Sequence, residues 1–114
     1  MVSTYGGVDP VSPVDASDLK LVSPAATSHA TNSVVSSFDN AMVVTVFFAT
    51  AAAAGVTGTP PTGETERYDL FNGNLQGLSS NDELQAASGA TGVKTATSSQ
   101  SVKSYAAILT LRPA

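Results

Sequence analysis

The hydrophobic positions of this chain are most concentrated between Ala41 and Thr50, where β-branched and aromatic residues include no charge, Pro or Gly. A run of this kind predicts a β-strand that is covered on both faces. Because side chains alternate across a strand, Met42 and Val44 point to one side and Val43 and Phe47 to the other. Neither side is suited to water. The remaining chain must therefore cover this central strand, which favours a fold of two packed sheets.

A second strong strand is predicted from Lys103 to Leu111, with Tyr105 and Leu109 on one face and Ile108 on the other. Weaker patterns predict further strands between turns rich in Gly, Pro and Asn. They are Met1 to Tyr5, Leu19 to Val22 along a sheet edge, Ser33 to Phe38, Glu64 to Phe71, Leu75 to Leu78, Asn81 to Ala87 as a strand or one helical turn, and Val93 to Ser99.

Two turns and one loop are predicted between these segments. Asp39-Asn40 is expected to join the Ser33 segment to the central strand as a hairpin. Asn72-Gly73 predicts a type I′ hairpin turn, because both residues tolerate a positive φ. Ala51 to Ala54 are expected to open a long loop, since Gly and a Pro-Pro pair follow closely.

Seven to nine short strands with little or no helix predict an all-β fold, namely an antiparallel β-sandwich of the jelly-roll or immunoglobulin-like kind. The chain has 114 residues. This length predicts a single domain, residues 1–114, whose core is large enough to fold without disulfides or a structural metal. Cysteine is absent, which excludes disulfides and a cysteine nucleophile.

Charge and composition narrow the classes of partner. Nine acidic residues against five basic ones give a net charge of −4, so we expect no nucleic-acid partner. The longest uncharged apolar run, Ala41 to Val56, is interrupted by Thr and Gly and is too short for a membrane span. Only 12% of the residues are charged, and a surface of Ser, Thr, Asn and Gly is common in virion and extracellular proteins.

Several segments occur in an order that resembles a known kind of module. They are Thr4-Tyr5-Gly6-Gly7-Val8-Asp9-Pro10 with Pro13-Val14-Asp15, then Asn40-Ala41-Met42-Val43-Val44, then Pro60-Pro61-Thr62-Gly63-Glu64-Thr65-Glu66-Arg67-Tyr68-Asp69, then Gly89-Ala90-Thr91-Gly92, and Leu109-Thr110-Leu111-Arg112-Pro113. The chain resembles the C-terminal part of the jelly-roll-like β-sandwich modules in secreted bacterial surface proteins and in phage tail or virion proteins. The resemblance implies a sandwich fold without a catalytic motif. In such modules the Tyr5 segment follows a set of N-terminal strands that this chain lacks. The resemblance therefore also implies that an edge or part of the core is closed by another subunit, by a partner strand or by rearrangement.

The densest acidic cluster consists of Glu64, Glu66 and Asp69. Paired carboxylates can act as acid and base on a glycosidic bond. However, Glu64 and Glu66 lie two apart on one predicted strand face beside Arg67, which is typical of a solvated rim. We therefore expect no catalytic residue here.

The other candidates for chemistry are also explained by structural roles. Asp9, Asp15 and Asp18 lack the spacing of a calcium loop, and Asp9 before Pro10 is expected to cap a turn. His29 is the only histidine and has no Gly-x-Ser-x-Gly motif to accompany it, so a loop or strand-end position is expected. We expect no metal and no cofactor.

The sequence thus predicts a non-enzymatic structural protein that acts through subunit contacts. It would be a homo-oligomer or a subunit of a larger assembly, either in a phage virion, as a capsid-decorating or tail component, or in an extracellular surface structure. The alternative is a carbohydrate-binding or adhesion module that binds a cell-surface glycan. Tyr5, Tyr68 and Tyr105 are the predicted contacts with a glycan or partner, because aromatic rings stack on sugars.

Overall fold

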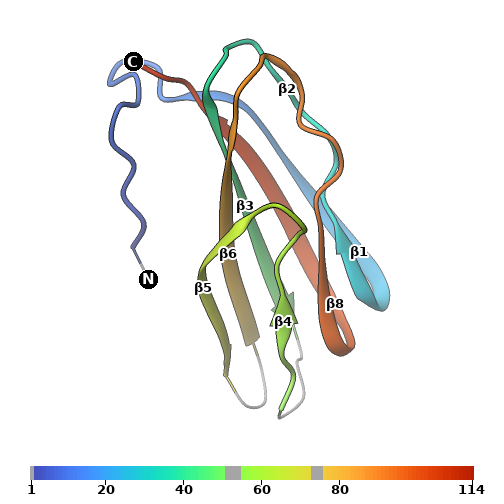
Figure 1. The fold of residues 1–114 in the computed structure, drawn as a ribbon. Coiled ribbons are helices and arrows are strands. Elements are labelled where there is room, and N and C mark those ends of the chain that lie inside the picture. The colour runs from blue at the N-terminus through green and yellow to red at the C-terminus, as the bar shows by residue number, and fades with distance from the viewer. Residues whose placement is uncertain (1, 51–54, 73–75) are drawn as a thin grey trace.

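The computed structural model describes residues 2–50, 55–72 and 76–114. Over these residues the protein is all-β and has no helix, and its antiparallel strands form the predicted sandwich-like fold (Figure 1). The strands are β1 (Val14–Ala30), β2 (Val35–Ser36), β3 (Ala41–Thr50), β4 (Gly58–Thr59), β5 (Thr65–Asn72), β6 (Gln76–Gln85), β7 (Gly89–Ala90) and β8 (Thr95–Leu111). A helix long and apolar enough to cross a membrane does not occur in these ranges.

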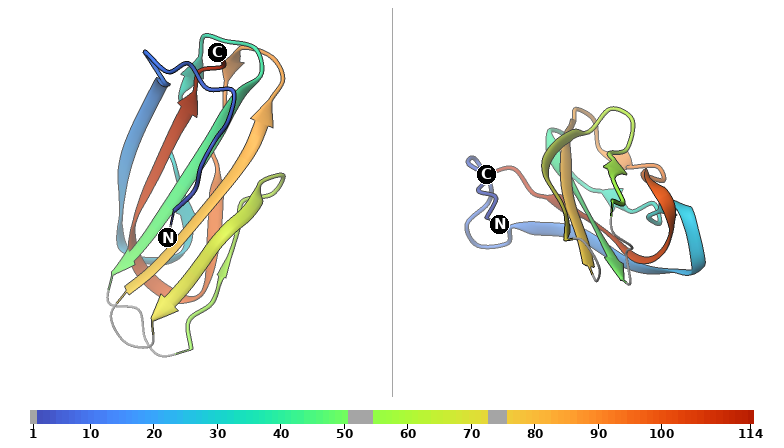
Figure 2. Two further views of the ribbon diagram at one scale, coloured as in Figure 1. Left: turned by 90° about the vertical axis from the view of Figure 1, so that its left-hand side faces the viewer. Right: turned by 90° about the horizontal axis from the view of Figure 1, so that it is seen from below.

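The main sheet has the strand order β1-β8-β3-β6-β5, and β4 pairs with β8 outside this path. β3 is the middle strand of the five and is paired along its length with β6 on one side and β8 on the other (Figure 2). The central strand predicted from the apolar run is thus confirmed with the same bounds, Ala41–Thr50.

The second layer of the fold is formed largely by the two longest strands. β1 and β8 have 17 residues each. Shifts in their pairing between Val22 and Ala26, and again before Ser28, mark a bend beyond which both strands curl over the main sheet (Figures 1 and 2). β4 and the separate β2–β7 pair join them there. We call the face of the main sheet that looks toward this layer the inner face, and the opposite face the outer face.

The hydrophobic core lies between the inner face and the second layer. Phe47 of β3 is 6% exposed and packs against Ala96 and Ala106 of β8, with Val22 at the margin. A second cluster consists of Ala49, Val56 and Val102. Because Ala96 precedes the bend of β8 and Ala106 follows it, Phe47 holds both parts of that strand against β3.

The predicted edge segment Leu19 to Val22 is part of a much longer strand. β1 does lie at the sheet edge, but it continues through Pro24 to Ala30. A proline is tolerated here because an edge strand needs hydrogen bonds on one side only, and Pro24 falls within the irregular pairing. The strand predicted for Met1 to Tyr5 is wrong for its described residues, 2–5, which pair with no strand.

The hairpin predicted between Ser33–Phe38 and the central strand is also wrong. Only Val35–Ser36 is a strand, and it pairs with β7. The physical reason is that both edges of β3 are already occupied by β6 and β8. Asp39 and Asn40 do form a turn, in which Asn40 has a φ of 59°.

Four segments predicted separately are merged into two strands. β6 (Gln76–Gln85) joins the described parts of the segments predicted from Leu75 and Asn81, and Leu75 itself lies outside the described residues. β8 (Thr95–Leu111) joins the segments predicted from Val93 and Lys103. The backbones of the polar residues between the predicted segments continue the two strands. The β5–β6 hairpin is confirmed by the pairing of Asn72 with Gln76, whereas Gly73 and the Ala51 to Ala54 segment lie outside the described residues.

Candidate functional site

The outer face of the main sheet is apolar on all five strands. Its apolar side chains, assigned by alternation and register, are Leu19, Leu21, Met42, Val44, Val46, Phe48, Leu70, Leu78, Leu84, Tyr105 and Leu109. Leu19 of β1 is 64% exposed and Leu84 of β6 is 61% exposed, so the outer face reaches water on either side of β3. The two-sided apolar character of β3 thus has a structural cause: one side meets the core, and the other belongs to this outer face.

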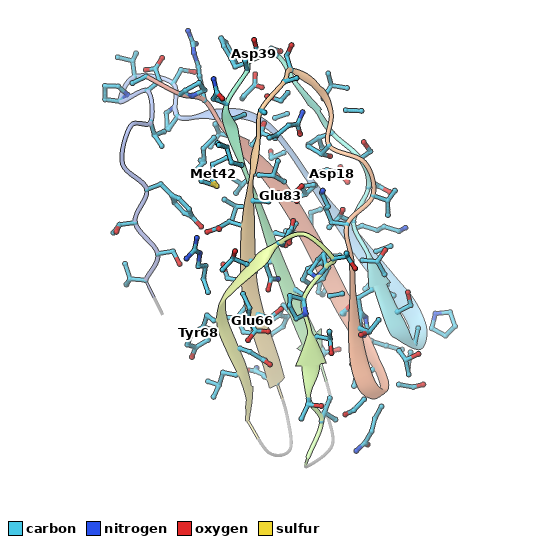
Figure 3. All side chains as sticks on the ribbon, viewed as in Figure 1. Asp18, Asp39, Met42, Glu66, Tyr68 and Glu83 are labelled. Atoms are coloured by element: carbon cyan, nitrogen blue, oxygen red, sulfur yellow. The ribbon has the colours of Figure 1, made fainter. Side chains whose placement is uncertain are left out.

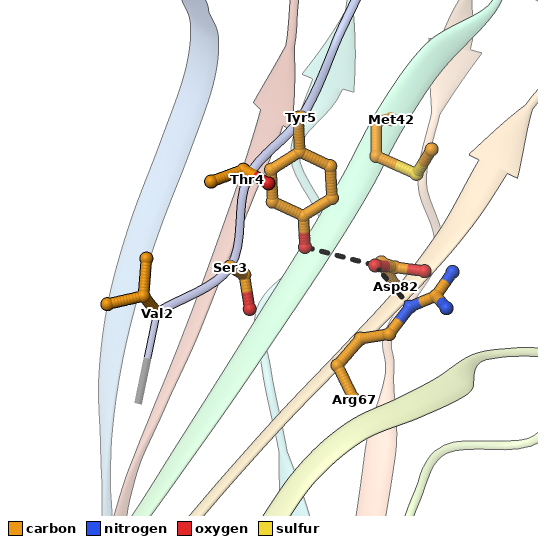
Figure 4. A pocket seen from close by; sticks show the side chains of 7 residues that line it. All are labelled: Val2, Ser3, Thr4, Tyr5, Met42, Arg67 and Asp82. Atoms are coloured by element: carbon orange, nitrogen blue, oxygen red, sulfur yellow. Dashed lines mark hydrogen bonds and ion pairs between the residues drawn. The ribbon is translucent and has the colours of Figure 1, made fainter.

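An ion pair lies within this apolar face. Asp82 of β6 is 2% exposed, and its Oδ2 accepts a hydrogen bond from Arg67 Nε at 2.8 Å. The Tyr5 hydroxyl donates to the same oxygen at 3.0 Å (Figure 4). Burial, followed by the hydrogen bond to Asp82, raises the pKa of Tyr5 to about 12. Tyr5 therefore remains a hydrogen-bond donor across the physiological pH range.

The N-terminal arm, Val2 to Gly7, crosses the outer face at this ion pair (Figure 2). Together with Met42 it lines an open pocket of about 400 Å³ beside Arg67 and Asp82. The side chain of Arg67 is half exposed, and its Nε donates the hydrogen bond to Asp82. Its terminal nitrogens are suited to oxygen atoms of a ligand or partner.

The three predicted tyrosines all lie on the side of the outer face. Tyr105 of β8 is 41% exposed and opposite Phe48, and Tyr68 of β5 is opposite Ser80. Figure 3 shows Tyr68 projecting on the side where the arm lies. They do not form one site, because Tyr5 contacts Asp82 whereas Tyr105 belongs to a strand on the other side of β3.

A bulge interrupts the alternation of side chains along β5. The pairing of β5 with β6 shifts between Glu66 and Tyr68. One additional residue reverses the faces that follow. Tyr68 and Leu70 therefore lie on the outer face, whereas Glu64 and Glu66 lie on the inner side.

Glu64 is buried on the inner side and is not part of a solvated rim. It is 9% exposed, and its Oε2 accepts a hydrogen bond from Thr45 Oγ1 at 2.5 Å. Its other oxygen, Oε1, is buried and has no partner among the described residues, and the same holds for Oδ1 of Asn81. Burial raises the pKa of the Glu64 carboxyl above its ordinary value, and the negative charge of Glu83 adds to this rise. Glu83 itself forms an ion pair with Lys94.

The raised pKa of Glu64 gives a testable pH dependence. A carboxyl whose pKa is higher in the folded state favours folding at low pH, and this contribution is lost as the pH rises through the folded-state pKa. We expect Glu64→Gln to unfold at a higher temperature than the wild type at pH 8. The gap should close as the pH falls toward 4. Thermal unfolding followed by circular dichroism measures this, with the exposed Glu66→Gln as control. An equal gap at both pH values would contradict the prediction.

His29 is buried in the bend between the two layers. It is 4% exposed, with Nδ1 at 2.7 Å from Ser104 Oγ and Nε2 at 2.8 Å from Ser98 Oγ. Ser98 donates its hydroxyl proton to the carbonyl of Gln100, so it accepts from His29 Nε2–H, and Nδ1 accepts from Ser104. Since Ser98 and Ser104 stand on either side of the bend in β8, His29 ties the two parts of this strand together. His29 was expected in a loop or at a strand end, and it is the second-to-last residue of β1.

The three aspartates considered for calcium are engaged separately. Asp9 Oδ1 accepts from the backbone amides of Val11 and Ser12, as expected of a turn cap, and its Oδ2 pairs with Arg112. Asp15 accepts from the amide of Ser37. Asp18 accepts from Asn32. In the described ranges the structure brings no three His, Cys, Asp or Glu side chains together for a metal ion.

Comparisons of the chain with protein-family models, with curated proteins and with solved structures find no match. The resemblance to jelly-roll-like modules therefore stays a prediction. The outer face, with the ion pair of Asp82 and Arg67 in it, is the strongest candidate for a functional surface.

Proposed function

We propose that this protein is a non-enzymatic assembly module whose outer face packs against other copies of the same chain. The observation that carries this proposal is the apolar outer face. Antiparallel sheets that border water on one side normally carry polar residues there. Here large apolar side chains reach solvent on strands at both ends of the sheet, including Leu21 at 54% and Leu70 at 50% exposure. Contiguous apolar surfaces of this kind mark protein interfaces.

The distribution of charge favours a second copy as the occupant. The chain carries a net charge of −4, so two copies repel each other on average. On the outer face the charges of Asp82 and Arg67 cancel, and Lys103 near the end of that face adds one positive charge. Glu64, Glu83 and Asp18 point to the inner side instead. Two copies that meet through their outer faces therefore bring little net charge together.

We assign this assembly to a virion, as a capsid-decorating or tail component, or to an extracellular surface structure. The support is compositional, because only 12% of the residues are charged and the remaining polar surface consists largely of Ser, Thr, Asn and Gly.

A second candidate function is carbohydrate binding or adhesion. It is favoured by the pocket of about 400 Å³ at Tyr5, Arg67 and Asp82, in which an aromatic ring lies beside charged groups that bind hydroxyls. A glycan ligand whose binding is lost in Arg67→Ala would favour this function over assembly.

The assembly proposal predicts a concentration-dependent mass. We expect light scattering of the wild type to show association that rises with protein concentration. In Leu84→Asp/Tyr105→Asp the dissociation constant should increase about a hundredfold or more, because two carboxylates would be buried in an apolar contact. Leu84 is 61% exposed and Tyr105 41% in the single chain, so neither belongs to the core and the fold is expected to persist.

Val93→Asp is the matched control for this measurement. Val93 is 60% exposed, like Leu84, but lies between β7 and β8 and away from the outer face. It should associate as the wild type does. A wild type that stays a folded monomer at high concentration would overturn the assembly proposal and leave carbohydrate binding as the better candidate.

A further inference from the structure

The outermost strand of the main sheet, β1, has a free edge. It pairs with β8 on one side, and the described residues place no strand on its other side (Figure 2). Between Ala16 and Val22 its pairing with β8 is regular, without a bulge. A regular, unpaired edge that carries exposed leucines is a template for another strand. Leu19 and Leu21 are 64% and 54% exposed on this edge.

The charges on this edge strand are complementary to themselves. Asp18 and Lys20 flank Leu19 and both point to the inner side. Among the described residues Lys20 forms no ion pair, and Asp18 contacts only the amide of Asn32, at 2.8 Å. We propose that β1 pairs antiparallel with β1 of a second copy, with Leu19 opposite Leu19 of that copy.

This register places two pairs of opposite charges across the new contact. Asp18 lies opposite Lys20 of the second copy, and Lys20 lies opposite Asp18 of the second copy. On the other side of the strands Leu21 lies opposite Ser17 of the second copy. Cross-strand pairs of opposite charge stabilise antiparallel strands, whereas like charges directly opposite destabilise them.

Neighbouring registers are disfavoured by the same residues. A shift by two residues in one direction places Asp18 opposite Asp18, and in the other direction Lys20 opposite Lys20. A shift by one residue turns the outer face of one copy to the side of the other copy's inner face. The sequence around Leu19 therefore favours this register over the neighbouring ones.

The proposed pairing rests on the assembly function and deepens it by naming one of its contacts. Two main sheets would join into one continuous sheet, with both outer faces on the same side. The apolar surface would then double in extent without a break at β1. The edge strands β5 would remain at the two ends of the joined sheet.

Charge reversal tests this pairing. Asp18→Lys and Lys20→Asp each place two like-charged pairs in the contact, and each should weaken dimerisation measured by analytical ultracentrifugation about tenfold. Asp18→Lys/Lys20→Asp restores opposite charges and should return close to wild-type affinity. An equimolar mixture of the two single variants should form a mixed dimer, because the two lysines of one chain face the two aspartates of the other.

The outcomes separate this inference from the assembly proposal. If the wild type associates and the charge variants associate equally well, β1 pairing is wrong while assembly through the outer face stands. If the wild type is a monomer throughout, both are wrong. The pairing would also be overturned if neither the double variant nor the mixture regained wild-type dimerisation affinity. The single changes would then weaken dimerisation by altering the single chain and not by placing like charges across the contact.

The register has its own test, because the protein contains no cysteine. Leu19→Cys places two thiols opposite each other across the twofold contact, about 5 Å apart at Cβ. Mild oxidation should therefore convert it to a disulfide-linked dimer several times faster than Leu84→Cys, which is equally exposed but lies on β6. Equal rates for the two variants would contradict the register.

Discussion

His29→Ala is expected to lower the free energy of unfolding by about 3 kcal/mol, out of the roughly 5–15 kcal/mol typical of a small domain. The change removes a ring that is 4% exposed and leaves the Ser104 hydroxyl without its acceptor. It also separates the two parts of β8 that His29 connects. Urea unfolding followed by circular dichroism measures the loss.

Ser28→Ala is the matched control, because Ser28 is the exposed neighbour of His29 on the same strand. It should change the free energy of unfolding by no more than about 0.5 kcal/mol. Equal losses in the two variants would show that His29 does not tie the layers together.

The same residue predicts a loss of stability in acid. Burial lowers the pKa of His29 below its ordinary value of 6.5. The unfolded chain therefore binds a proton at a pH where the folded chain does not, so the contribution of His29 is full above pH 6.5 and is lost as the pH falls toward the folded-state pKa. Wild-type stability should fall between pH 7 and 5 more steeply than that of His29→Gln, whose amide does not titrate in this range.

Phe47→Ala is expected to cost about 3–4 kcal/mol of stability. Phe47 is 6% exposed and fills the space between β3 and both parts of β8, where it contacts Ala96 and Ala106. These small neighbours cannot close the resulting cavity, so the contacts are lost outright. The expected result is a lower urea midpoint with an unchanged slope.

The adjacent Phe48 provides an internal control. It has the same side chain on the same strand, but it points to the outer face and is half-buried. In dilute, monomeric protein Phe48→Ala should cost only about 1–2 kcal/mol. At concentrations where the protein associates, Phe48→Ala should weaken association more than Phe47→Ala does. The opposite order of stabilities would show that the inner and outer faces have been assigned to the wrong sides.

The sequence predicted the central strand and the fold class because both depend on local pattern. The apolar run from Ala41 to Thr50 has no polar break, and the turn residues elsewhere separate short strands. The pattern could not tell which side of β3 meets the core, since Val44 and Phe47 are both apolar. Burial against the second layer decides this, and that layer is made by residues distant in sequence.

Long-range pairing explains most of the differences between prediction and structure. The ion pair and its neighbour come from three separate segments, which contain Arg67, Asp82 and Tyr5. No local sequence motif therefore indicates this group. The bulge after Glu66 leaves no sign in the alternation of β5. By contrast, the arrangement of Asp18, Leu19 and Lys20 was visible in the sequence, but it gains meaning only once β1 is known to have a free edge.

The position of β8 between β1 and β3 has a consequence for the order of folding. β8 lies between β1 and β3 and supplies part of the second layer, yet it is the last strand along the chain. During synthesis β1 and β3 therefore leave the ribosome long before the strand that separates them, and Leu19, Leu21 and Phe47 have no final partners until it arrives. Sheets that depend on such distant pairing fold slowly and are prone to aggregate in the meantime. The newly made chain is thus most vulnerable to contact with its own copies just before β8 is inserted.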